Sequence, residues 1–306
     1  MAIYQNTGVK ETVTTKTGSA QELESQSTLR SSLPDKPVVL NEAGDSSPVI
    51  YLRELWIYRE LLYFLTWRDI KVRYKQTAMG AAWAVIQPLF AMLLFALFFG
   101  LWIRVPSDGM PYLVFFYCGL LPWTFFANAV SQSSQSLILN SNLITKVYFP
   151  RAIIPAASIG AALVDLLIAS VILVGLALYY GLGTTWSVLM LPALVVLAVL
   201  FSLGCGICIA ALTAKYRDIR HALPFVLQLW MFLTPIIYPL SVVPAKWRWL
   251  VLLNPLAGIV EGMRAALVGR GIDWSAISIS VVMTFASLVV AAYVFRRIER
   301  GLADLI

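Results

Sequence analysis

The strongest constraint on the fold of this chain is a series of long stretches that carry almost no charged side chains. The first runs from Met79 to Ile103 and holds no Asp, Glu, Lys or Arg. At about 1.5 Å of rise per residue, a helix of this length crosses a hydrocarbon core of about 30 Å. We predict an all-α, polytopic membrane protein with six membrane-spanning helices, over Met79–Ile103, Tyr112–Val130, Ala152–Tyr180, Trp186–Ala214, Ala222–Leu240 and Trp274–Phe295.

The composition agrees with a membrane protein. Only 13% of the 306 residues are charged and 59% are hydrophobic, whereas a soluble domain has about 25% charged residues. A chain this apolar cannot cover its core with polar surface, so membrane lipids are its expected solvent. The net charge of +7 fits the excess of Lys and Arg in the cytoplasmic loops of membrane proteins, and we predict no nucleic-acid partner.

The distribution of basic residues predicts the orientation in the membrane. With an even number of spans both termini lie on one side, and that side holds most of the Lys and Arg. These include the groups at Arg68–Lys75, Lys146–Arg151, Lys215–Arg220 and Arg296–Arg300. Because basic loops stay in the cytoplasm, we predict a multi-pass protein of the inner (cytoplasmic) membrane with both termini cytoplasmic.

The chain divides into a tail and a transmembrane domain. Residues 1–48 are rich in Ser, Thr, Glu and Lys without an apolar signal segment, and predict a disordered cytoplasmic tail before a domain over 49–306. Ile50–Trp67 mixes charged and apolar residues, as an amphipathic helix in the membrane interface does. Ser241–Asp273 holds an apolar stretch broken at Asn254-Pro255 and too short to span, which predicts re-entrant helices between spans five and six.

The sequence lacks the motifs of an enzyme or of a pump with its own energy source. No glycine-rich phosphate-binding loop is present, so we predict no cofactor and no catalytic site in this chain. Cys205 and Cys208 have C-x-x-C spacing, but no second Cys or His pair completes a metal site. Ion-coupled transporters usually need several intramembrane ionisable groups, whereas only Asp165 stands in the predicted spans. Any driving energy is therefore expected to come from a partner.

Four strings of residues carry a resemblance to a known family. They are WRDIKVRYKQTAMGAAWAVIQP (Trp67–Pro88), NLITKVYFPR (Asn142–Arg151), KYRDIRHALPFVLQLW (Lys215–Trp230) and PAKWRWLVLLNPLAGIVEGMR (Pro244–Arg264). In this order they resemble the permease subunits of bacterial ABC exporters of polysaccharides, which are the O-antigen, teichoic acid and capsule permeases. The resemblance does not extend to the tail.

The resemblance implies a half-transporter. Two copies would pair with two ATPase subunits, which bind ATP and Mg²⁺, to move a lipid-linked polysaccharide of O-antigen type from cytoplasm to periplasm. Ile50–Trp67 resembles the family's gate helix, Trp67–Lys75 its link to the first span, and Ser241–Asp273 its re-entrant pair. Asn142–Arg151 resembles the coupling helix that enters a cleft of the ATPase, with contacts expected from Asn142, Lys146, Tyr148, Phe149 and Arg151.

The resemblance also implies that the first and fifth spans line the translocation path. Sugars have apolar faces that stack on aromatic rings, and the candidate lining residues are Trp83, Phe90, Phe98, Trp102, Phe225, Trp230 and Tyr238. The alternative is the ordinary role of aromatic residues in spans, which is contact with lipid, neighbouring helices or the interface. At the cytoplasmic entrance, Arg68, Arg73 and Lys75 are candidates to bind the diphosphate of the lipid carrier.

Three further charged residues in apolar surroundings need an interpretation. They are Asp165, Glu261 and Arg264. Asp165 lies about mid-depth in the third span and is expected to be paired, protonated or facing water. A protonated carboxyl bonded to a neighbouring helix is the favoured interpretation. Glu261 and Arg264 stand three residues apart and are expected to pair across one helical turn, holding the shape of the re-entrant segment.

Two alternative functions stay open at this stage. One is an ABC permease of the same fold that exports drugs or small lipids. The other is a lipid flippase that acts alone, without an ATPase subunit.

Overall fold

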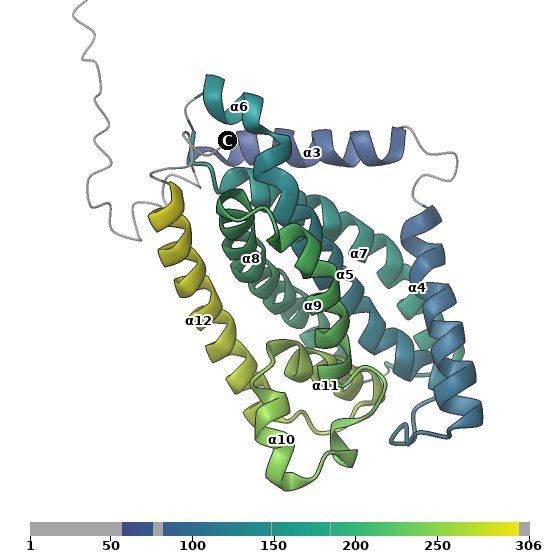
Figure 1. Ribbon diagram of the computed structural model, residues 1–306. Helices are drawn as coiled ribbons and strands as arrows, with labels where there is room; N and C mark the ends of the chain where they lie inside the picture. Colours follow the sequence, from purple (N-terminus) through teal and green to yellow (C-terminus); the bar gives the residue numbers. More distant parts are fainter. Residues whose placement is uncertain (1–56, 76–81, 148, 184, 300–306) are drawn as a thin grey trace, which may run out of the picture. The chain divides into compact units, whose positions relative to one another are not determined.

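The computed structural model describes residues 57–75, 82–147, 149–183 and 185–299 (Figure 1). All of them belong to one unit of the chain, Ser46–Ile306. Every secondary-structure element in these ranges is helical, and no strand occurs in them, which confirms the prediction of an all-α fold. The predicted tail, the first part of the predicted interface helix and Tyr148 lie outside the described residues.

Five helical segments are long and apolar enough to cross a membrane. They confirm five of the six predicted spans, with ends that differ by a few residues except at the second, which continues from Val130 to Leu139. In chain order they are α4 (Ala82–Phe95) continued by the π-helical η1 (Ala96–Trp102), α5 (Tyr112–Leu139), α7 (Ile153–Tyr179), η2 (Trp186–Met190) continued by α8 (Leu191–Lys215), and α12 (Trp274–Glu299).

The predicted fifth span, Ala222–Leu240, is shorter in the structure. It is α9, which covers Ile219–Leu233 and has 15 residues. At about 1.5 Å per residue it extends about 22 Å, less than the hydrocarbon core of about 30 Å. The helix ends because Pro235 has no backbone N–H and disfavours helical geometry in the residue before it. Thr234 accordingly has an extended backbone, with ψ 135°.

The segment after α9 is bent sharply. It contains η3 (Leu240–Val242), α10 (Ala245–Leu252) and α11 (Pro255–Val268), and α10 and α11 meet at 104°. The break falls at Asn254-Pro255, as the sequence predicts. The Asn254 side chain accepts a hydrogen bond from the Leu256 N–H at 3.2 Å, so it caps α11 where Pro255 has no donor to offer.

Helix α11 packs against the spans at one of their ends only. Gly258 lies against Ala276 and Ser280 in the first turns of α12. Arg264 reaches the carbonyl of Phe115, near the start of α5. Figure 1 shows α10 and α11 together at the end of the helices opposite to α3 and α6. We call these two ends the α10–α11 end and the α3–α6 end.

Helix α3 (Arg59–Lys75) runs across the other end of the spans, and α6 (Ser141–Lys146) lies at the same end (Figure 1). The hydroxyl of Thr66 packs on Gly160 of α7 and donates to the carbonyl of Ala157 at 3.5 Å. The residues that we predicted to link this helix to the first span, Trp67–Lys75, are themselves helical and continue α3. Nothing in that stretch interrupts a helix, since it holds neither Gly nor Pro.

Helix α5 is the centre of the core. Its side chains Phe115, Phe116, Tyr117 and Phe126 are among the largest that are fully buried. The predicted span ends at Val130, and α5 continues beyond it through the polar run that begins at Ser131 to Leu139, with several of its serines buried. These small hydroxyls are accommodated because they return hydrogen bonds to their own helix, as Ser136 does to the Ser133 carbonyl.

Close contact between α8 and α12 depends on Gly204. A Cβ there would lie 2.4 Å from the Ser287 hydroxyl and 3.0 to 3.1 Å from α12 backbone atoms. We expect Gly204→Ala to destabilise the chain by about 1–3 kcal/mol, because the backbone cannot give way as a side chain can. Thermal unfolding of the purified protein in detergent checks this. Gly175→Ala on α7 is the control, since it meets nothing within 4 Å. Equal melting temperatures for the two variants contradict the prediction.

Candidate functional site

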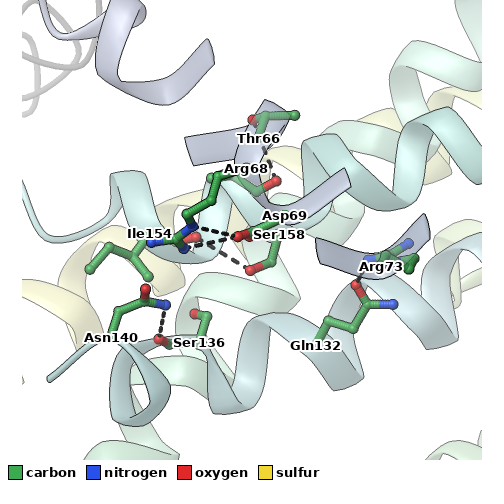
Figure 2. Close-up of polar contacts among 10 residues, drawn as sticks. Thr66, Arg68, Asp69, Arg73, Gln132, Ser136, Asn140, Ile154 and Ser158 are labelled. Carbon is green, nitrogen blue, oxygen red and sulfur yellow. Dashed lines mark hydrogen bonds and ion pairs between the residues drawn. The ribbon is translucent and has the colours of Figure 1, made fainter. Parts of the chain in front are cut away.

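A cluster of polar side chains forms where α3 meets α5 and α7. Arg73 of α3 pairs with the Asp165 carboxylate of α7 and donates a hydrogen bond to the Gln132 amide oxygen of α5. Tyr74 donates its hydroxyl to the same carboxylate. Figure 2 shows Arg73 and Gln132 turned toward one another. The three helices are thus joined by one network, although their residues lie far apart in the sequence.

The network gives Asp165 a charged partner. The side chains of Arg73 and Asp165 are only 27% and 19% exposed, so each charge would be costly to bury without the other. The bond to a neighbouring helix that we expected of Asp165 is therefore present, and Arg73 and Tyr74 of α3 make it. Burial and the bond to Asp165 raise the pKa of Tyr74 to about 12, so its hydroxyl remains a donor at neutral pH.

A cavity of about 260 Å³ lies beside this network, bounded by α3, α4, α5 and α7. Arg73, Tyr74 and Asp165 form one wall. Three side chains that the sequence analysis did not select, Gln87, Asn128 and Gln132, also line it. Gln87 and Asn128 stand among apolar residues and Gln132 lies in a polar run, so only the packing of the helices shows that the three face one space.

The other two predicted entrance cations do not join Arg73. Arg68 pairs with its neighbour Asp69 at 2.8 Å, and Lys75 is exposed near the end of α3. Figure 2 shows the Arg68–Asp69 pair set apart from Arg73 along the helix. The structure therefore does not gather Arg68, Arg73 and Lys75 into one anion site.

The predicted coupling segment divides into exposed and anchored residues. Asn142 and Lys146 are exposed on α6. Phe149, by contrast, is 5% exposed and belongs to the core cluster beneath α3 and α6. The Arg151 guanidinium donates to the carbonyl of Glu299 at 2.8 Å. In this conformation Phe149 and Arg151 hold the segment in place, and Asn142 and Lys146 present its surface.

The predicted lining aromatics fall into two groups. Five of them expose much of their surface, and Trp83 borders the cavity beside Arg73. Trp230 instead packs on Phe126, with ring centroids 5.2 Å apart, and Tyr238 is half-buried. The exposed ones are Trp83, Phe90, Phe98, Trp102 and Phe225.

A second polar site lies at the α10–α11 end, around Arg264. This side chain is 3% exposed and donates to the carbonyls of Pro235 and Ile236, each at 2.8 Å, and of Phe115 at 3.3 Å. Its guanidinium also lies 3.7 Å from the centroid of the Phe115 ring. The predicted pair with Glu261 is present at 3.8 Å. Arg264 therefore satisfies backbone groups that the early end of α9 leaves without donors.

The sequence of this chain is similar to those of known proteins over most of its length. A family model described as ABC-2 type transporter matches residues 60–268. An O-antigen export system permease protein, RfbA of Myxococcus xanthus, is 32% identical over 216 residues, or 70% of this chain and 82% of the relative. RfbA of Klebsiella pneumoniae is 28% identical over 248 residues, or 81% and 95%. The polysialic acid transport protein KpsM of Escherichia coli is 23% identical over 239 residues, or 77% and 92%.

Proposed function

Because this chain belongs to the ABC-2 type transporter family, we propose that it is the membrane subunit of an ATP-driven exporter of a lipid-linked polysaccharide, of O-antigen type. The observation that carries the proposal is the alignment with RfbA, which covers most of both chains at 32% identity. A second relative, RfbA of Klebsiella pneumoniae, is also named for O-antigen export and aligns over 81% of this chain, which supports the same cargo.

The proposed assembly has two copies of this chain and two ATPase subunits. The sequence holds no phosphate-binding loop of its own, so hydrolysis is assigned to the partner. Helix α6 stands at the α3–α6 end with Asn142 and Lys146 exposed. Phe149 and Arg151 anchor α6 to the rest of the chain, so a displacement of α6 by the ATPase would be transmitted to the helices that contact these two residues. This anchorage supports a role for α6 as coupling helix.

The orientation follows from charge. Lys71, Lys75, Lys146 and Lys215 belong to the helices and loops of the α3–α6 end, and basic residues favour the cytoplasmic face. We assign that end to the cytoplasm, with α3 as an interfacial gate helix. Helices α10 and α11 then form a re-entrant pair on the periplasmic side of the inner membrane. The contacts of α11 with the first turns of α5 and α12 support this arrangement.

Lys146→Ala tests the coupling role. We expect the change in ATPase rate that this chain causes in its partner subunit to fall about tenfold, the size of a lost charged contact at an interface. Yield and melting temperature should be unchanged, because Lys146 is exposed. The measurement is ATP hydrolysis by the partner reconstituted with and without this chain.

Lys246→Ala is the matched control, since this lysine is equally exposed on α10 at the other end of the chain. It should leave the ATPase rate unchanged. If no ATPase subunit copurifies with the chain and none responds to it, the half-transporter is excluded. A flippase that acts alone then becomes the better proposal.

A further inference from the structure

The cavity beside Arg73 has polar walls on four different helices. Tyr74 comes from α3, Gln87 from α4, Asn128 and Gln132 from α5, and Asp165 from α7. Its volume is about 260 Å³, near the lower limit for pockets that bind small organic groups. Trp83 of α4 is among its lining residues and is 55% exposed. The cavity wall therefore includes a side chain that a ligand outside the protein can contact.

Some polar side chains of this wall have no hydrogen-bond partner among the described residues. Within the described residues, the side chains of Gln87, Thr124 and Asn128 make no hydrogen bond, and their polar atoms are not enclosed by protein. Gln87 and Asn128 lie inside helices that span the membrane. Unsatisfied amides are costly in hydrocarbon, so such groups persist only where water or a polar ligand meets them.

The charged groups of the cavity wall favour a neutral polar ligand over an anionic one. Arg73 is already paired with Asp165 and bonded to Gln132. The two charges cancel, so a phosphate would have to displace a carboxylate to gain the guanidinium. The groups that remain are two amides and a hydroxyl, together with the rings of Trp83 and Phe125. Neutral donors and acceptors beside aromatic rings suit a ligand with many hydroxyls and an apolar face.

We propose that this cavity binds one sugar unit of the exported glycan. Gln87, Thr124 and Asn128 bond its hydroxyls, and Trp83 packs on its ring. The inference rests on the proposed export function and deepens it, because it assigns a recognition site inside one copy of the chain. The Arg73–Asp165 pair is a positioning element, which holds α3 over the cavity and keeps its net charge at zero.

Photo-cross-linking tests where the glycan binds. Trp83→p-benzoylphenylalanine is introduced into the full chain in cells that make the glycan from a radiolabelled sugar. We expect irradiation to attach the label to this chain. Leu167→p-benzoylphenylalanine is the control, since Leu167 is 56% exposed on α7 near Asp165 but does not line the cavity. It should capture at most a small fraction of that label.

Two further variants test the hydrogen bonds. Gln87→Leu or Asn128→Leu, combined with the cross-linker, should lower the labelled yield about two- to tenfold each, the effect of one lost neutral hydrogen bond. Gln135→Leu should not lower it, because Gln135 is exposed on α5 outside the cavity. Protein yield from the same membranes shows that each variant is folded.

The outcomes separate the proposals. Label captured at position 83 and weakened by the leucine variants supports the sugar site. Export that needs this chain, with no more label at position 83 than at 167, overturns the sugar site and leaves the exporter standing. Adducts of ordinary phospholipid mass, formed equally when glycan synthesis is blocked, also overturn it and assign the cavity to lipid headgroups. Export that continues without this chain overturns the proposed function itself.

Discussion

Replacing Arg264 with methionine is expected to lower the free energy of unfolding by about 3–5 kcal/mol, which is the cost of breaking a buried charged interaction. The change removes the donors of three backbone carbonyls, those of Phe115, Pro235 and Ile236. It also leaves the Glu261 carboxylate without its nearest cation. Methionine fills a similar volume, so the loss reports the missing bonds more than a cavity.

The measurement is the melting temperature of the purified chain in detergent, followed by the loss of monodisperse protein on heating. The melting temperature of Arg264→Lys should lie between those of the unchanged chain and Arg264→Met. Lysine keeps the charge but cannot reach three carbonyls at once. Arg270→Met is the control. That arginine is 46% exposed and lies 3.7 Å from Asp108, and exposed pairs contribute at most about 1 kcal/mol. A melting temperature for Arg264→Met close to that of the control would show that Arg264 does not hold the end of α9.

Asp165→Leu is expected to destabilise the chain strongly, and a second substitution is expected to restore part of the loss. Alone, the change leaves Arg73 partly buried beside an apolar surface, with Gln132 as its one remaining partner among the described residues. With Arg73→Met as well, no unpaired charge remains. The double variant should therefore be more stable than the sum of the single losses by about 1–3 kcal/mol, the range for residues in direct contact.

A double-mutant cycle on melting temperature measures this coupling. The pair Arg68 and Asp69 supplies a matched cycle on the same helix, since Arg68 is 37% exposed and its coupling should stay below about 1 kcal/mol. Additive losses for Arg73 and Asp165 would mean that the ion pair does not join α3 to α7. In that case the orientation of α3 rests on apolar contacts such as those of Leu65.

The membrane spans could be predicted because their cause is local. A stretch such as Ala152–Tyr180 must form a helix in lipid wherever its neighbours lie, since only helices satisfy their own backbone there. The end of α9 is also a local effect, and Pro235 could have shown it. We extended the span to Leu240 because hydropathy alone does not register the geometry that proline imposes on Thr234.

The candidate sites could be predicted only in part, because they depend on distant residues. Asp165 was recognisable as an intramembrane acid, and Arg73 as a basic residue near the membrane. Their pairing joins positions 92 residues apart, which no spacing rule connects. Phe149 looked like an exposed contact in a basic loop, yet the tertiary fold buries it under α3 and α6. The amides of the cavity wall were inconspicuous for the same reason.

The early end of α9 has a consequence for the order in which segments of the chain take their final places in the membrane during synthesis. The carbonyls of Pro235 and Ile236 receive their donors from Arg264, some thirty residues further along. While the ribosome is still translating the residues between them, those carbonyls lack this partner. An unsatisfied carbonyl is disfavoured in hydrocarbon, so α9 should reach its final depth only after α11 has emerged. Helix α9 and the bent segment that follows it are thus best regarded as one unit of assembly.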